Sequence, residues 1–305
     1  MSPRERPAVH VGPTPEESLL DAVRAGGGEP AALDEADALV WTGHNPQELP
    51  RPLPDRVRWV QLPSAGVESW IAAGVVDRAR IFTSAAGAYA RSVAEHALAL
   101  VLGGARRLPE AARATRWGAP PGAGLAGRTV AVVGAGGIGR ELIAMLGPLD
   151  VEILAVTRRG RAVPGADVTL AADRTGEVWP AADFVVIAAP ATAGTRHLVG
   201  REQLTAMRSG AWLVNVARGS LVDTDSLTEA LADGRLGGAA LDVTDPEPLP
   251  DDHPLWREPR ALITPHAANP PAALEPAFDE RVRENVARFA AGADLLGRID
   301  PDAGY

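Results

Sequence analysis

The sequence contains no cysteine and no lysine. Without cysteine there are no disulfides, no thiolate metal ligands and no thiol nucleophile. Without lysine there is no Schiff-base chemistry and no lysine general base, and all 30 cationic residues are arginine. We therefore expect any catalysis to use other titratable groups, and we expect no metal site.

Long apolar runs and excess positive charge are also missing. The longest apolar stretch, "HALALVLGGA", is much shorter than the roughly 20 residues that cross a membrane. The first dozen residues carry charge but no apolar core of signal-peptide length. The net charge of −9 leaves no basic surface for nucleic acid. We expect a soluble, cytoplasmic protein that binds neither membranes nor nucleic acids.

The apolar residues that are present predict an α/β protein. With 305 residues, 46% of them hydrophobic, the chain is long enough for two domains. Its central apolar runs are continuous, as strands buried on both faces require, and helical segments separate most of them. We expect strands at "TVAVVG", "VEILAV", "DFVVIAA", "AWLVNV", "GGAALDV" and "ALIT". This alternation predicts a doubly wound parallel sheet, the Rossmann arrangement.

The flanking regions contain further predicted elements. Short strands are expected at "AVHVG", "DALVW", "VRWVQL" and "ARIFT", with a helix at "PEESLLDAVRAG". Longer helices are expected over residues 90–107 and 272–291.

A glycine-rich turn follows the first central strand. Gly134, Gly136 and Gly139 have the G-x-G-x-x-G spacing, with Gly137 and Ile138 between them, and a helix begins there. In such turns the first glycine allows the tight bend, the second lets the backbone approach a pyrophosphate, and the third allows close helix–strand packing. The helix N-terminus adds amide donors for the anion. The motif predicts dinucleotide binding.

The end of the next strand indicates which dinucleotide is bound. NAD-binding units usually have Asp or Glu there to bind the ribose hydroxyls. This chain has Thr157, Arg158 and Arg159 instead. Two guanidinium groups and a hydroxyl suit a 2′-phosphate. We expect NADP(H) to be preferred over NAD(H); the alternative is an exposed basic loop with no such role.

Several motifs together resemble the D-2-hydroxyacid dehydrogenase family. They are "VVGAGGIGR", "PATAGTRHLV", "LVNVARGSLVDTDSL", "ALDVTDPEPLP" and "HPLW…ALITPHAA", and the resemblance runs from about residue 60 to 290. In that family the Rossmann cofactor domain is inserted into a smaller flavodoxin-like substrate domain. The resemblance implies a substrate domain of residues 1–95 and 269–305, and a cofactor domain of residues 96–268.

The resemblance also implies the catalytic residues. Arg218, in the Asn-x-Ala-Arg-Gly motif, binds the substrate carboxylate and polarises the keto oxygen. His266 is the acid/base, and Glu247 is its carboxylate partner. Each follows a predicted strand, so we expect all three at the ligand-binding edge of the sheet. Another histidine, His96, is expected to be an ordinary helix residue and not a second acid/base.

The resemblance implies further residues that contact the cofactor or the substrate. The cofactor positions are Pro190, Thr192, Thr195, Ala217 and Asp242, with Asp242 near the nicotinamide amide.

On the substrate side, the backbone amides of Ala65 and Gly66 are expected to face the substrate carboxylate. Tyr89 is a further candidate substrate contact. It belongs to a segment, "SAAGAYARSVAE", that departs from the family pattern, since Ser84, Ala86 and Tyr89 replace an Asn, a Pro and an Asn.

These expectations converge on an NADPH-dependent reductase of small 2-oxoacids, similar to bacterial glyoxylate/hydroxypyruvate reductases. Two alternatives remain open: a dinucleotide-sensing co-repressor of the same fold, and a phosphoglycerate dehydrogenase-like enzyme. The absence of disordered tails disfavours the co-repressor, and the absence of an appended regulatory domain disfavours phosphoglycerate oxidation. We also expect a homodimer joined through the cofactor domains, with "HALALVLGGA" and Trp117 at the contact.

Overall fold

The computed structural model describes residues 6–118 and 122–304. The chain divides into two compact units. Unit 1 comprises Met1–Tyr89 and Pro270–Tyr305, and unit 2 comprises Ala90–Asn269. Each unit contains one sheet whose strands all pair in parallel. The prediction of an α/β protein with a doubly wound parallel sheet is confirmed.

Unit 2 contains a seven-stranded sheet in the order β12-β11-β10-β9-β6-β7-β8. Its strands are β6 (Thr129–Val133), β7 (Glu152–Thr157), β8 (Val168–Ala171), β9 (Phe184–Ile187), β10 (Trp212–Asn215), β11 (Gly238–Leu241) and β12 (Ala261–Ile263). The chain runs outward from β6 to β8, then returns to the other side of β6 with β9. Because the strand order reverses there, a crevice for a ligand is expected above the β6–β9 pair.

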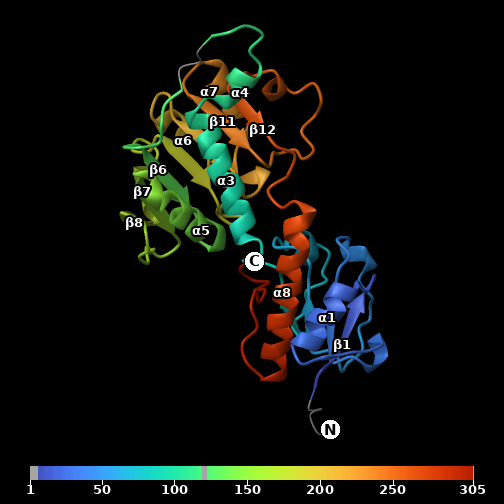
Figure 1. Ribbon diagram of the computed structural model, residues 1–305. Coiled ribbons are helices and arrows are strands. Elements are labelled where there is room, and N and C mark those ends of the chain that lie inside the picture. The colour runs from blue at the N-terminus through green and yellow to red at the C-terminus, as the bar shows by residue number, and fades with distance from the viewer. Residues whose placement is uncertain (1–5, 119–121, 305) are drawn as a thin grey trace. The chain divides into compact units, whose positions relative to one another are not determined.

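Helices cover both faces of this sheet. They are α3 (Ala90–Ala105), α4 (Leu108–Ala112), α5 (Gly137–Leu146), α6 (Arg201–Ala206) and α7 (Thr224–Ala232). Helix α3 lies against α5 and contacts β10 and β11 (Figure 1). On the other side, Leu204 of α6 and Leu227 and Leu231 of α7 are buried in one cluster with apolar residues from most of the strands. This double cover explains why the strands read as continuous apolar runs.

Unit 1 contains a five-stranded sheet in the order β2-β1-β3-β4-β5. Its elements are β1 (Ala8–Gly12), α1 (Glu17–Ala25), β2 (Glu29–Pro30), β3 (Ala38–Trp41), β4 (Trp59–Gln61), α2 (Glu68–Ala72), β5 (Ile81–Thr83) and α8 (Pro271–Ala290). Helix α8 comes from the far end of the chain and lies beside α1 (Figure 1). Short 3-10 turns occur in both units at Leu33–Glu35, Pro46–Glu48, Gly147–Leu149, Ala172–Glu177, Gly219–Leu221 and Pro254–Trp256.

All ten predicted strands and the three predicted helices are present, with each end within two residues of its predicted position. Two strands were not predicted: β2, which has only two residues, and β8, whose first residues are partly exposed. Both are edge strands, so neither carries the long apolar run of a strand buried on both faces. Within the described residues, no helix is both long and apolar enough to cross a membrane.

A buried polar network joins α8 to the sheet of unit 1. Gln61, Thr83 and Asn285 are completely buried. The Thr83 hydroxyl accepts a hydrogen bond from Trp59 Nε1 (2.8 Å) and donates to Gln61 Oε1 (2.9 Å). Asn285 Nδ2 donates to the same Gln61 oxygen (2.9 Å). Buried polar groups are costly unless paired, so this network fixes where α8 docks on the sheet.

We predict that Thr83→Val destabilises unit 1 by about 1–3 kcal/mol, because it leaves the buried Trp59 indole without its acceptor. Thr83→Ser is the matched control, since it keeps the hydroxyl and loses only a methyl group. Urea unfolding followed by tryptophan fluorescence measures the difference. Equal midpoints for the two variants would show that the hydroxyl does not stabilise the fold.

Candidate active site

In the glycine-rich turn after β6, two glycines pack against the protein backbone and one borders open space. Gly134 has φ of 101°, and a Cβ there would lie 2.4 Å from the backbone nitrogen of Ala189. A Cβ on Gly139 would lie 2.5 Å from the Gly134 carbonyl oxygen. A Cβ on Gly136, in contrast, would meet no atom within 4 Å. The first and third glycines are therefore required by packing, and the second leaves free space.

That free space lies at the start of α5. Gly136 and Gly137 are exposed, and Gly137 and Ile138 form the first residues of the helix. Unpaired amides at a helix N-terminus attract an anion. The turn thus fits the pyrophosphate of a dinucleotide, which needs close backbone approach and amide donors.

The loops beside this turn offer further polar groups. At the end of β7, the buried Thr157 Oγ1 is left without a hydrogen-bond partner, and Arg158 and Arg159 are exposed. After β9, the Thr195 hydroxyl donates to the Pro190 carbonyl (2.8 Å) and accepts from the Thr192 amide (2.8 Å).

An unpartnered buried hydroxyl is costly in the protein alone, so Thr157 is a natural hydrogen-bonding group for a bound molecule. The loop after β9 is held in shape by its own threonines, and it leaves the sheet beside the glycine turn. These residues fit a dinucleotide on the β6–β9 crevice.

The strands β10, β11 and β12 bring the three predicted catalytic residues to the same edge. Asn215 pairs with Leu241, and Leu241 pairs with Ile263, so the three strands end level with one another. Arg218, Glu247 and His266 follow these strands in that order. Parallel strands expose their carboxyl ends on one side, and the three segments that carry these residues leave the sheet there.

Asn215 shapes the turn that carries Arg218. This completely buried side chain donates from Nδ2 to the Arg218 carbonyl (2.9 Å) and accepts from the Ala217 amide (3.1 Å). The next residue is Gly219, where a Cβ would lie 1.8 Å from the Thr244 carbonyl oxygen. The Arg218 turn therefore packs directly against the segment that leads to Glu247. Ala217, a predicted cofactor residue, is buried in this turn.

His266 and Glu247 form a direct pair. The distance from His266 Nδ1 to Glu247 Oε1 is 2.7 Å, with the side chains 51% and 42% exposed. An ionised carboxylate only accepts hydrogen bonds, so Nδ1 carries the hydrogen and Nε2 is left to face a ligand. Such half-exposed pairs add little to stability. What the pair provides is an oriented imidazole.

Asp242 lies beneath the turn that carries His266. Its side chain is almost completely buried, and its carboxylate accepts from the Thr264 hydroxyl (2.6 Å) and the amides of Ala267 (2.8 Å) and Ala268 (3.2 Å). His96 Nε2 lies 3.3 Å away. Burial would raise the pKa of Asp242, but hydrogen bonds from His96, Thr264 and Ala267 outweigh it and keep that pKa below its usual value.

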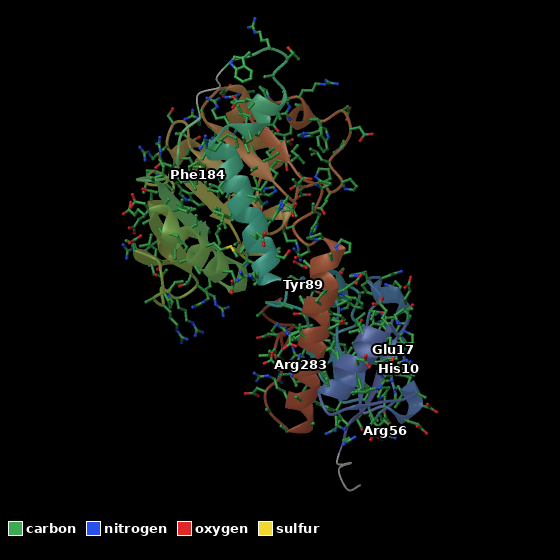
Figure 2. All side chains as sticks on the ribbon, viewed as in Figure 1. His10, Glu17, Arg56, Tyr89, Phe184 and Arg283 are labelled. Atoms are coloured by element: carbon green, nitrogen blue, oxygen red, sulfur yellow. The ribbon has the colours of Figure 1, made fainter. Side chains whose placement is uncertain are left out.

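The predicted substrate residues belong to unit 1. Ala65 and Gly66 lie in the loop after β4, where Ala65 is exposed. Tyr89, labelled in Figure 2, is the last residue of the first segment of unit 1 and is buried. Its hydroxyl donates to the Pro63 carbonyl (2.8 Å), and burial raises its pKa above the ordinary range. Within the described structure this hydroxyl joins two loops of its own unit.

Four residues that shape these loops carry no sequence signal for that role: Asn215, Thr264, His96 and Arg281. Asn215 was in a recognised motif, but its hydrogen bonds are not visible in sequence. His96 is on α3, as expected, yet it reaches Thr264 Oγ1 at 2.9 Å. Arg281 of α8 donates to the carbonyls of Ser84 (3.2 Å) and Ala86 (2.9 Å), and so supports the loop that departs from the family pattern.

Comparison with known proteins places this arrangement in a family. The family model for the NAD binding domain of D-isomer specific 2-hydroxyacid dehydrogenases matches residues 98–268, more than half of the chain. The chain is 40% identical over 292 residues to an uncharacterized protein in the proB 3′ region of Corynebacterium melassecola, covering 93% of this chain and 95% of that one. It is 34% identical over 236 residues to a glyoxylate reductase of Thermofilum pendens, covering 72% of this chain and 66% of that one.

A solved structure agrees. The D-isomer specific 2-hydroxyacid dehydrogenase from Xanthobacter autotrophicus Py2, in complex with NADPH and MES, matches with a TM-score of 0.83 and 25% identity, covering 98% of this chain and 100% of that one. This chain belongs to the D-isomer specific 2-hydroxyacid dehydrogenase family of NAD(P)-dependent oxidoreductases.

Proposed function

We propose that this protein reduces a small 2-oxoacid of the glyoxylate or hydroxypyruvate type with NADPH. The observation that carries the proposal is the His266–Glu247 pair, held at 2.7 Å on the sheet edge that also carries Arg218 and the glycine turn. The glyoxylate reductase among the relatives supports the substrate class.

The residues divide the chemistry among them. When bound, the nicotinamide cofactor supplies the hydride that reduces the carbonyl carbon. Negative charge then develops on the carbonyl oxygen, and a fixed cation and a proton donor stabilise it. We assign the first role to Arg218, which also binds the substrate carboxylate, and the second to His266, which donates a proton from Nε2. Glu247 accepts from Nδ1, so it orients the ring.

Replacing His266 tests the proposal. His266→Ala should lower kcat for NADPH-dependent 2-oxoacid reduction by about 10²- to 10⁴-fold, the usual contribution of general acid catalysis. The Kd for NADPH, measured by fluorescence, should change little because His266 is outside the glycine turn. The assay is NADPH oxidation with a panel of 2-oxoacids.

Glu247→Gln separates orientation from charge, because the amide can still accept from Nδ1. It should lower kcat less than Glu247→Ala does, since Glu247→Ala leaves Nδ1 without an acceptor. An unchanged kcat in His266→Ala would refute the acid/base assignment. NADPH binding with no turnover of any 2-oxoacid would favour a dinucleotide-sensing role. Oxidation of phosphoglycerate alone would favour a phosphoglycerate dehydrogenase-like enzyme.

We also propose that NADPH is preferred over NADH. The support is the end of β7, where the unpartnered Thr157 hydroxyl and two exposed arginines stand in place of a carboxylate. The structure from Xanthobacter autotrophicus Py2 contains NADPH. Arginine binds phosphate through paired charge-assisted hydrogen bonds, so these residues favour the 2′-phosphate.

The expected preference is about 10- to 100-fold in kcat/KM, since one charge-assisted hydrogen bond contributes about 1.5–3 kcal/mol. The double change Thr157→Asp with Arg158→Ala should reverse it, because it removes an attraction and adds a repulsion. Arg161→Ala is the control and should leave the preference unchanged, since it removes an exposed arginine from the same loop beyond Gly160. If the double variant still prefers NADPH, this loop does not select the cofactor.

We propose further that the protein is a homodimer joined through unit 2. Leu102, Leu108 and Trp117 are exposed apolar side chains on this unit, at the end of α3 and beyond it. Other residues of "HALALVLGGA", such as Leu100 and Val101, are buried within unit 2 and cannot contribute. The expected contact therefore shifts toward Leu108 and Trp117.

Sedimentation equilibrium at micromolar concentration should give twice the 31.7 kDa mass of the chain. Leu108→Glu combined with Trp117→Glu should shift the protein toward the monomer, because charge is costly in an apolar contact. Val168→Glu, at an exposed apolar residue on β8, is the control and should leave the mass unchanged. A monomeric wild type would contradict this assembly.

A further inference from the structure

The turn that carries His266 is attached to helix α3. Two α3 side chains one helical turn apart, Ser92 and His96, both contact it. Ser92 Oγ donates to the Ala268 carbonyl (2.8 Å), and His96 Nε2 lies 2.9 Å from Thr264 Oγ1. Residues four apart share one face of a helix. This face of α3 therefore holds both ends of the Thr264–Ala268 turn.

The hydrogens in this network can be assigned. The Thr264 hydroxyl has one hydrogen, and its short 2.6 Å contact with the Asp242 carboxylate uses it. The same oxygen can then only accept from His96, so His96 Nε2 carries a hydrogen. The donors run in one direction, from His96 to Thr264 and from Thr264 to Asp242. Asp242 also accepts from the amides of Ala267 and Ala268.

The backbone of His266 needs this support. Its φ is 52°, in the left-handed region, which is unfavourable for a residue with a side chain. Its amide donates to the carbonyls of Asp242 (2.8 Å) and Thr264 (2.9 Å). A strained conformation persists only where the surroundings over-determine it. At residue 266 the surroundings are the buried carboxylate and the two α3 side chains.

We propose that Ser92 and His96 are positioning residues for His266. They hold the Thr264–Ala268 turn through Thr264, Asp242 and the Ala268 carbonyl, and so fix the imidazole against Glu247. This inference rests on the proposed acid/base role of His266. Neither residue is assigned to substrate, cofactor or reacting atoms.

Among the charged groups near His96, the carboxylate that it contacts is that of Asp242, at 3.3 Å from Nε2. On α3 itself, Arg91 and Glu95 are exposed, and Arg91 pairs with Glu141 of α5 (3.9 Å). The strands β10 and β11, which α3 also contacts, carry no charged side chain within their bounds. Asp242, directly after β11, is buried while His96 is half-buried.

The test compares variants that remove or keep the donor at position 96. His96→Leu should lower kcat by roughly 10- to 100-fold, the usual cost of a misplaced catalytic group. His96→Gln, whose amide can still donate to Thr264, should recover most of that loss. Ser92→Ala should lower kcat by a smaller factor. The Kd for NADPH should stay near the wild-type value in all three.

Two measurements separate positioning from a general structural effect. In a His266→Ala background, His96→Leu should cause no further loss of the residual turnover, because residues that act through one group are not additive. In the protein without ligands, ¹⁵N NMR should show the neutral His266 ring protonated mainly at Nδ1 in the wild type, and a mixture of tautomers in His96→Leu. The His266→Ala spectrum assigns the signal.

The results of these variants either support or overturn the positioning role of Ser92 and His96. Wild-type kcat in His96→Leu, an additive loss in the double variant, or no rescue by glutamine would overturn the positioning role and leave the proposed function intact. An unchanged kcat in His266→Ala would overturn both. If His96→Leu does not fold, Ser92→Ala decides alone: reduced kcat with unchanged NADPH affinity supports the proposal, and wild-type kcat refutes it.

Discussion

The buried carboxylate of Asp242 is the constraint on which the candidate site depends. A carboxylate taken out of water is unfavourable unless hydrogen bonds replace its hydration. Here the Thr264 hydroxyl, two successive backbone amides and the nearby His96 do so. The same contacts bend the chain immediately after β12. The cost of burying one charge is thus offset by interactions that also determine the path of the loop bearing His266.

The parallel sheet of unit 2 brings the loop that bears His266 together with the loops that bear Arg218 and Glu247. Because β10, β11 and β12 end level, the loops after them share one edge, and small side chains let them pack closely. Gly219 is the clearest case, since any Cβ there would overlap the Thr244 carbonyl. The Arg218 turn and the segment before Glu247 can approach only because that position is glycine. The glycine turn after β6 follows the same rule on the neighbouring part of the sheet.

Sequence patterns predicted the central strands and the glycine turn, because each depends on neighbours within a few positions. The three residues at the sheet edge were implied by the resemblance to a family. Whether Arg218, Glu247 and His266 act as assigned stays a prediction. The role of His96 was not accessible, because its partners are more than 140 residues away and a helical histidine has no local signature. The same is true of Arg281, whose contacts with the Ser84 loop exist only after α8 has docked.

Unit 1 is built from two chain segments, one before and one after unit 2 in the sequence. The ribosome therefore makes the two parts of unit 1 at different times. The sheet of β1 to β5 is translated early, but Asn285, which completes its buried network with Gln61, is made only after the whole of unit 2. At about 5–20 residues per second, the intervening chain takes on the order of ten seconds or more to emerge. During that interval unit 2 can complete its own fold, while the surface that receives α8 remains uncovered. The nascent chain therefore exposes the surface that later buries Phe278, Val282 and Val286 of α8, and a chaperone could shield that surface until α8 is made.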